Sequence, residues 1–105
     1  SLDGFSPMGP CILTADSTAY PPCLDIRSYV NGELRQNSNT SKLIFNIDHI
    51  VSELSGGMTL KAGTIISTGT PSGVGMGFDP PKFLKAGDEV TCQIEEIGQL
   101  RNVVK

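Results

Sequence analysis

Apolar and polar residues alternate along residues 24–30, and this period of two predicts a β-strand with one buried face. The strand is followed by Asn31-Gly32, a dipeptide typical of the two-residue turns that join hairpin strands. We therefore expect a hairpin whose return strand covers residues 33–36. Residues 37–41 are all polar and predict a loop, which either presents amides and hydroxyls to a pocket or satisfies its own backbone.

Four further runs predict strands in the rest of the chain. Residues 89–95 alternate between apolar and polar side chains, and Gly98 then turns the chain into residues 100–104, which predicts a second hairpin. Residues 11–14 and 64–67 are short apolar runs that follow turn-forming residues, so we expect strands there too.

One segment has the spacing of an amphipathic helix. Asn46 is a suitable N-cap, and Gly56-Gly57 ends the pattern. His49 lies off the apolar stripe, so it is interpreted as a partly exposed residue in the first turns of the helix. The stripe, with the i, i+3, i+4, i+7 spacing of one helix face, consists of Ile47, Ile50, Val51 and Leu54.

The tetrapeptide Leu-Lys-Ala-Gly occurs twice, at residues 60–63 and 84–87. In both places it precedes a predicted strand, so we expect the same turn to lead the chain into a strand twice. Two copies are too few for a solenoid, which needs about three or more stacked units. The repeat is therefore interpreted as a local turn that the chain uses twice.

Composition favours a single small domain that is mainly β with a short helix. The chain has 105 residues, of which 38% are hydrophobic, with 12 glycines and 7 prolines, and this favours short strands joined by turns. A net charge of −3 without a cluster of Lys and Arg argues against nucleic acid or an anionic membrane as partner. Because no apolar run could span a bilayer, we expect a cytoplasmic protein, or a mitochondrial matrix protein if the source is eukaryotic.

The cysteines give little indication of chemistry. Cys11, Cys23 and Cys92 are odd in number and widely spaced, which suits neither a disulfide framework nor a Cys-x-x-Cys site and favours a reducing compartment. A cysteine nucleophile paired with His49 is an alternative, but the sequence context that would mark such a cysteine is missing.

The strongest functional indication lies in residues 68–77, where four glycines and two threonines follow an apolar run. Glycines allow positive φ and close approach of a ligand, and hydroxyls add donors, so the segment predicts a cradle for an oxyanion or carboxylate. A P-loop or a dinucleotide site would need a helix next, which the prolines within residues 78–81 prevent. The other interpretation is a glycine-rich connection without a ligand.

Five sequence blocks occur in order along nearly the whole chain. They are DGFSPMGP at residues 3–10, VNGELRQ at 30–36, SNTS at 38–41, TGTPSGVG at 68–75 and IGQLRN at 97–102. Together they resemble the C-terminal part of the catalytic domain of the fumarylacetoacetate hydrolase family. One glycine-rich loop would be weak evidence, whereas five ordered blocks make the resemblance specific.

The resemblance implies a mixed β-roll, here incomplete, with residues 1–105 as the C-terminal portion of the catalytic domain. It implies an enzyme acting on 2-oxo or acylpyruvate-type acids by carbon–carbon hydrolysis, decarboxylation or keto–enol isomerisation, with a divalent cation, usually Mg²⁺, stabilising the enolate. By the same resemblance, Thr70 contacts the carboxylate or oxo group of the substrate, Gly69 brings the main chain close, and Phe5 forms part of the pocket wall. Relatives commonly form homodimers, so a homodimer is implied as well.

The resemblance places the remaining parts of the site elsewhere. In relatives the metal ligands, two glutamates and an aspartate, and a lysine that polarises the substrate lie upstream of the first block, so we expect neither metal ligands nor an identified catalytic residue in this chain. Three hypotheses stay open: an inactive fragment of a metal-dependent enzyme, a non-catalytic β-roll module that binds a small carboxylate or a partner chain, and one half of a split enzyme.

Overall fold

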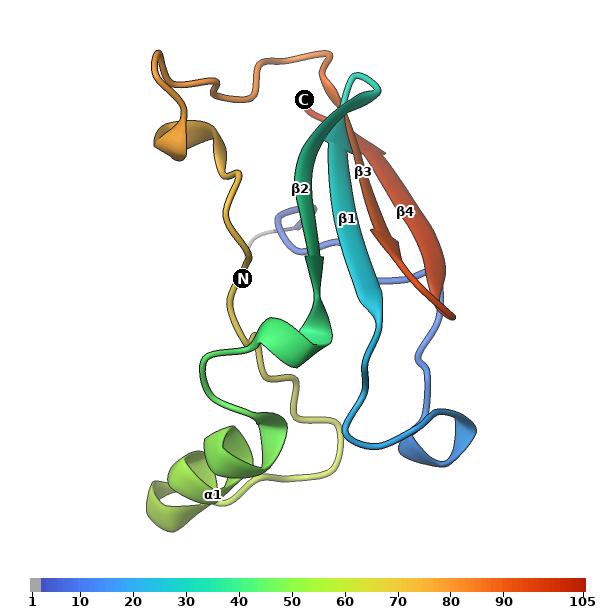
Figure 1. The fold of residues 1–105 in the computed structure, drawn as a ribbon, viewed down its shortest axis with the longest axis vertical. Helices are drawn as coiled ribbons and strands as arrows, with labels where there is room; N and C mark the ends of the chain where they lie inside the picture. Colours follow the sequence, from blue (N-terminus) through green and yellow to red (C-terminus); the bar gives the residue numbers. More distant parts are fainter. Residues whose placement is uncertain (1–2) are drawn as a thin grey trace.

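The computed structural model describes residues 3–105 and contains an open antiparallel sheet (Figure 1). Its spatial order is β2-β1-β3-β4, so β2 and β4 form the edges. Both expected hairpins form, and β1 pairs with β3 to join them. The predicted fold class, mainly β with one helix, is confirmed. The strands are β1 (Asp25–Val30), β2 (Glu33–Asn39), β3 (Glu89–Ile94) and β4 (Gly98–Val103).

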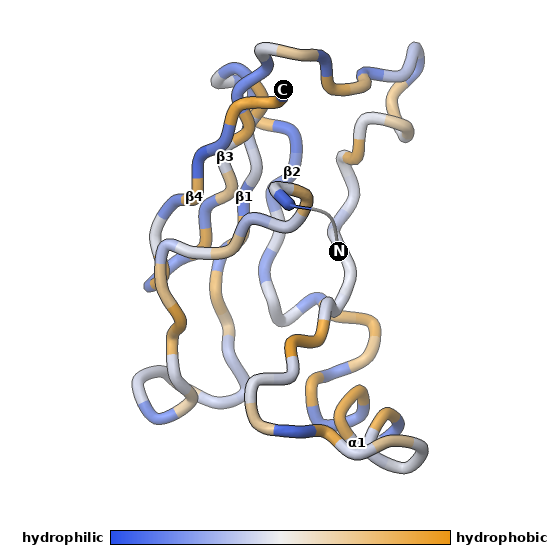
Figure 2. The backbone as a smooth tube through the Cα atoms, turned by 180° about the vertical axis from the view of Figure 1, so that it is seen from behind, coloured by the Kyte–Doolittle hydropathy of each residue, from blue (hydrophilic) through white to orange (hydrophobic). Residues whose placement is uncertain are grey.

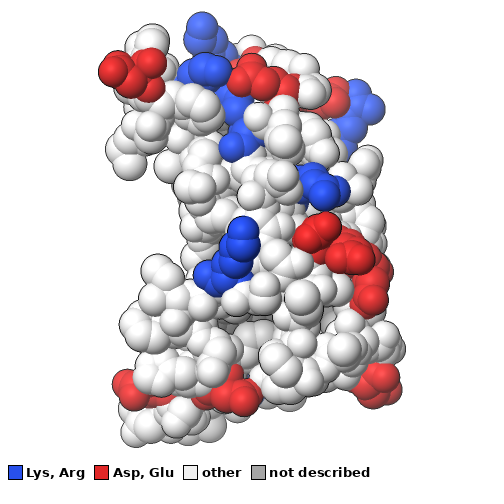
Figure 3. Space-filling model, in the orientation of Figure 1, with Lys and Arg blue, Asp and Glu red and all other residues white. Residues whose placement is uncertain are grey.

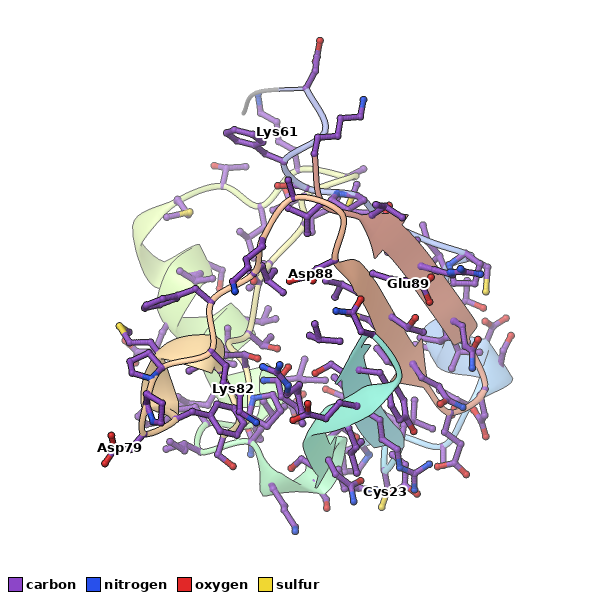
Figure 4. The ribbon with its side chains drawn as sticks, turned by 90° about the horizontal axis from the view of Figure 1, so that it is seen from above. Cys23, Lys61, Asp79, Lys82, Asp88 and Glu89 are labelled. Atoms are coloured by element: carbon purple, nitrogen blue, oxygen red, sulfur yellow. The ribbon has the colours of Figure 1, made fainter. Side chains whose placement is uncertain are left out.

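The turn of the first hairpin also fixes the start of β3. Asn31 and Gly32 have φ of 50° and 80°, the left-handed values of a two-residue hairpin turn. The Asn31 amide donates to Asp88 Oδ1 at 2.8 Å, and its oxygen accepts from the Glu89 N–H at 2.9 Å. Figure 4 shows Asp88 and Glu89 where the chain enters β3. One side chain thus ties the two hairpins together.

The two faces of the sheet differ in polarity. The register pairs Ile26 with Ile94 and Val30 with Val90, so these four apolar residues share one face. The segment at residues 9–10 lies against that face beside β4, and Figure 2 shows the chain near the N-terminus crossing the sheet there. The alternation seen in the sequence therefore separates a covered face from a polar one.

Few apolar side chains are buried. Among residues 3–105, Leu24 is the only buried hydrophobic residue, at 7% exposure, whereas Ile12 and Ile44 are 90% and 92% exposed. Soluble monomers rarely expose large contiguous apolar patches, so a surface with this many exposed apolar side chains is suited to contact with further protein.

The helix α1 (Ile47–Gly57) forms as predicted. The side-chain oxygen of Asn46 accepts from the His49 N–H at 2.8 Å, which satisfies one of the free donors at the helix start. The helix ends with the expected glycine pair. None of its residues is fully buried, so its apolar stripe covers little of the sheet.

Two predicted strands are absent, and one is longer than predicted. Residues 11–14 and 64–67 form no strand, because neither segment has a hydrogen-bonded strand partner within residues 3–105. Conversely, residues 37–39 are not a loop but extend β2, paired with β1. Their polar side chains are compatible with an edge strand, which is open to solvent. The short 3₁₀ helices are η1 (Ala15–Ser17), η2 (Thr40–Lys42) and η3 (Gly75–Gly77).

Candidate functional site

A groove of about 520 Å³ lies where β2 ends. One wall comes from residues 38–40 and 42–45, at the end of β2 and through η2, and the other comes from residues 68–72. Ile26 of β1 and Ile50 of α1 complete the lining. The groove therefore joins two of the blocks that the sequence singled out, SNTS and TGTPSGVG, which lie about thirty residues apart in the chain.

The glycine-rich loop, residues 68–77, runs alongside the free edge of β2, as the gold segment in Figure 1 shows. A Cβ atom on Gly73 would lie 2.0 Å from the Arg35 carbonyl oxygen, and one on Gly75 would lie 2.2 Å from that of Lys82. Gly69 has open space around it, but its φ of 100° favours glycine. Two glycines thus permit close packing of the backbone, and the third permits the bend beside the groove.

Thr70 is held by a residue of β2. Gln36 Nε2 donates to Thr70 Oγ1 and to the carbonyl of Pro71, both at 2.8 Å. No functional role for Gln36 was predicted, because nothing in the sequence pattern indicates that the end of a predicted strand contacts a loop more than thirty residues away.

Two of the three predicted substrate-binding residues line the groove. They are Thr70 and Gly69. Phe5 does not line it, and its side chain is 72% exposed. The structure therefore brings the first two together at one site and leaves the ring of Phe5 on the open surface.

The polar lining of the groove suits an anion. Lys42 is its only charged residue among the described residues, and hydroxyl groups come from Ser38, Thr40, Thr68, Thr70 and Ser72. Figure 3 shows acidic side chains at the upper and lower ends and along the right side, whereas the hollow at mid-height on the left, where η2 and the loop lie, shows no described acidic side chain. One cation and several hydroxyls without a competing carboxylate match a ligand that carries a carboxylate. Sequence reasoning had left Lys42 unmarked.

A charged cluster anchors the far end of the loop to β2. Lys82 Nζ donates to Glu33 Oε1 at 2.9 Å, and Arg35 Nε lies 3.2 Å from the same oxygen. The ring of Phe78 has the Lys82 ammonium 4.7 Å and the Arg35 guanidinium 5.3 Å from its centroid. Figure 4 shows Lys82 between the loop and β2, while Asp79 points away. The hydrogen bond from Lys82, with the charge of Arg35, lowers the pKa of Glu33 below its usual value.

The histidine and the cysteines that the sequence offered as catalytic candidates do not line the groove. His49 stacks on Phe45 with ring centroids 5.1 Å apart, and the three cysteines are free and exposed. Within residues 3–105, no group of three or more His, Cys, Asp or Glu is placed to hold a metal ion, so these residues do not fit a metal centre. No helix in the described part of the chain is long and apolar enough to cross a membrane.

The fold combines an open antiparallel sheet with a glycine-rich loop that lies against its edge strand β2. The family model described as fumarylacetoacetate (FAA) hydrolase C-terminal matches residues 1–105, and the chain belongs to this family. The resemblance predicted from the five blocks is thereby confirmed.

The most similar proteins include enzymes that act on small oxo acids. Oxaloacetate tautomerase YisK of Bacillus subtilis is 51% identical over 104 residues, which cover 99% of this chain and 35% of that protein. A mitochondrial oxaloacetate tautomerase of Bos taurus, FAHD2B, is 49% identical over 104 residues, with 99% and 33% covered. The chain thus spans about a third of the length of these relatives.

Solved structures of family members have the same fold over most or all of this chain. A fumarylacetoacetate hydrolase from Exiguobacterium antarcticum superimposes with a TM-score of 0.93 at 48% identity, over 100% of this chain and 38% of that one. A maleylpyruvate hydrolase from Sphingobium, in complex with manganese and pyruvate, gives 0.80 at 40% identity, over 91% and 34%. These two relatives are hydrolases, whereas the relatives above are tautomerases, so the family fold accommodates both kinds of reaction.

Proposed function

We propose that this chain is the substrate-side part of an enzyme that interconverts the keto and enol forms of a 2-oxo dicarboxylic acid such as oxaloacetate. The groove is the observation that carries the proposal, because Thr70, Gly69 and Lys42 line it together and no carboxylate of residues 3–105 does. The identity of 51% and 49% to two oxaloacetate tautomerases supports this reaction.

In this proposal Thr70 donates a hydrogen bond to a carboxylate or oxo oxygen of the substrate. Gly69 lets the main chain approach the same group, and Lys42 supplies a counter-charge. Phe5, which lies outside the groove, is proposed as pocket wall only when further protein covers it. Residues 1–105 would form the C-terminal portion of the catalytic domain.

The rest of the catalytic machinery is proposed to lie beyond this chain. The residues described here do not fit a metal centre, so a divalent cation, Mg²⁺ in our proposal, would be held by other residues of the full-length protein. When bound, such a cation stabilises negative charge on an enolate oxygen. We further propose a cytoplasmic or mitochondrial-matrix homodimer that binds neither nucleic acid nor membrane.

Hydrolysis is the second candidate reaction. It is favoured by the likeness to a maleylpyruvate hydrolase, a structure that contains manganese and pyruvate. A module that binds a small carboxylate without catalysis, or half of a split enzyme, would keep the groove and lack turnover of its own.

Turnover by the full-length natural protein tests the proposal. Ultraviolet absorbance follows the conversion of enol-oxaloacetate to the keto form, with and without Mg²⁺, and a parallel assay with maleylpyruvate detects hydrolysis. We expect rapid tautomerisation that a chelator abolishes. Hydrolysis alone would favour the second candidate, and binding of pyruvate without turnover would favour the non-catalytic module.

Thr70→Val tests the role of the hydroxyl. Loss of one hydrogen bond to a charged group should cost about 1–3 kcal/mol of transition-state stabilisation, measured as kcat/KM. Thr64→Val is the matched control, because Thr64 precedes the loop and does not line the groove. Equal kinetics in the two variants would remove Thr70 from the site.

A further inference from the structure

We propose that Gln36 is a positioning residue that fixes the direction in which the Thr70 hydroxyl donates. This inference rests on the proposed function, because it concerns the hydrogen bond from Thr70 to the substrate. Gln36 itself does not line the groove and acts through Thr70.

The amide of Gln36 is oriented by its neighbour on β1. Ser28 pairs with Gln36 in the register, and Ser28 Oγ lies 2.8 Å from Gln36 Oε1. Because this amide oxygen can only accept, the serine hydroxyl donates to it, and the NH₂ group is left to face the loop. The two hydrogen bonds of Nε2, to Thr70 and to the carbonyl of Pro71, use both of its protons.

A β-bulge aims the Gln36 side chain at the loop. The pairing shifts by one residue between Ser28↔Gln36 and Tyr29↔Leu34, so Arg35 is the extra residue of β2. Without this extra residue, the alternation along β2 would turn Gln36 to the opposite face of the sheet. The carbonyl of Arg35 is also the atom that leaves room only for hydrogen at Gly73. The bulge thus positions both the loop backbone and the residue that holds Thr70.

The consequence concerns the Thr70 proton. A hydroxyl has one proton and two acceptor sites, and Gln36 occupies one acceptor site from the β2 side. The proton of Thr70 is then available for an acceptor in the groove, where a substrate carboxylate or oxo oxygen would lie. Because the NH₂ group of Gln36 can only donate, it makes Thr70 a donor toward the ligand.

Substitutions at Gln36 in the full-length natural protein test this role. Gln36→Glu keeps the shape but offers an acceptor in place of the donor, so the Thr70 proton turns toward β2. Gln36→Leu removes the contact. We expect each to reduce the binding of pyruvate, used as probe, by on the order of tenfold, as expected for one hydrogen bond to a charged group. Gln99→Leu on the exposed side of β4 is the control and should bind normally.

The decisive measurement repeats the substitutions in the Thr70→Val background. If Gln36 acts through Thr70, Gln36→Glu causes no further loss there, and the two effects are strongly non-additive. Additive losses in an otherwise active enzyme would overturn this proposal alone, and so would normal binding by both Gln36 variants. A wild-type protein that neither binds pyruvate nor converts any 2-oxo acid would overturn the proposed function and this inference with it.

Discussion

The two Leu-Lys-Ala-Gly segments form the same turn and then lead into different structures. In each copy the residue after the glycine donates to the lysine carbonyl at 3.0 Å, from Thr64 to Lys61 and from Asp88 to Lys85. The two glycines have φ of 85° and 89°. Yet the second copy enters β3, whereas the first enters residues 64–67, which form no strand.

The difference comes from partners and not from the turn. After the second copy, Asp88 and Glu89 are bound by Asn31, and Val104 exchanges hydrogen bonds with Gly87 and Asp88. After the first copy, residues 64–67 have no such neighbour within residues 3–105, and Ile65 is 69% exposed. Local sequence is therefore sufficient for a turn, while a strand needs a second strand beside it.

The region after each turn also has a different task. Residues 84–95 form scaffold, held by backbone pairing at the centre of the sheet. Residues 60–77 lead to the glycine-rich loop, which is held on the edge of β2 by close packing at Gly73, by Gln36 and by the cluster at Glu33. The loop depends on a few specific contacts, so single substitutions should affect either the loop or the scaffold without affecting the other.

Gly73→Ala should have the largest effect, which is the loss of loop docking on β2. The added Cβ would lie 2.0 Å from the Arg35 carbonyl oxygen at a φ of 106°, so either the backbone of β2 or that of the loop must move. Overpacking and backbone strain together should cost about 2–6 kcal/mol of loop docking, seen as a large fall in kcat/KM of the full-length protein. Circular dichroism should show the sheet retained.

Gly77→Ala is the control for that prediction. Gly77 lies in the same loop, and a Cβ there would meet only a Val74 methyl group at 3.9 Å, an ordinary contact. We expect activity close to that of the unsubstituted protein. Equal losses at both positions would mean that flexibility of the loop, rather than its docking on β2, limits activity.

Asn31→Ala should weaken the scaffold region and spare the loop. The substitution removes the hydrogen bonds to Asp88 and Glu89 and puts alanine at a φ of 50°, so the free energy of unfolding should fall by about 1–3 kcal/mol. Thermal denaturation measures this loss. Binding of pyruvate per folded molecule should be unchanged, and a parallel fall in affinity would show that the two regions are coupled. Asn102→Ala, at an exposed position of the edge strand β4, should have little effect on either quantity.

Glu33→Gln should have the smallest effect, and it should depend on pH. The pKa of Glu33 is held below its usual value of 4.5 by Lys82 first and Arg35 second, so its anchoring contribution is present above that value and is lost as the pH falls through the lowered pKa. Hydrogen exchange at the Lys82 amide, which donates to the Gly75 carbonyl at 2.8 Å, reports the anchor. We expect a few-fold loss of protection at neutral pH, because exposed ion pairs contribute little.

The same measurement in acid is its own control. Below the lowered pKa of Glu33 the unsubstituted protein loses its charged partner for Lys82, so its protection should fall to that of Glu33→Gln. Equal protection of the two proteins at neutral pH would assign the anchor to Phe78 packing instead.

Features with a local cause were predictable from the sequence. The Asn31-Gly32 turn, the Asn46 cap and both Leu-Lys-Ala-Gly turns depend on residues within one short segment, and each forms. The family blocks also singled out Thr70 and Gly69, which line the groove, while their contact with a substrate stays a prediction.

By itself, the sequence determined the hairpins, the helix start, the turns and the family, because short-range backbone preferences and ordered motifs are written in neighbouring residues. Only the tertiary structure decided that residues 64–67 stay unpaired, that the polar residues 37–39 continue β2, and that Gln36 meets Thr70. Each of these depends on which distant segment supplies the hydrogen-bond partner. The one-residue bulge at Arg35 decides which face of the sheet carries Gln36, and no local sequence pattern predicts that bulge.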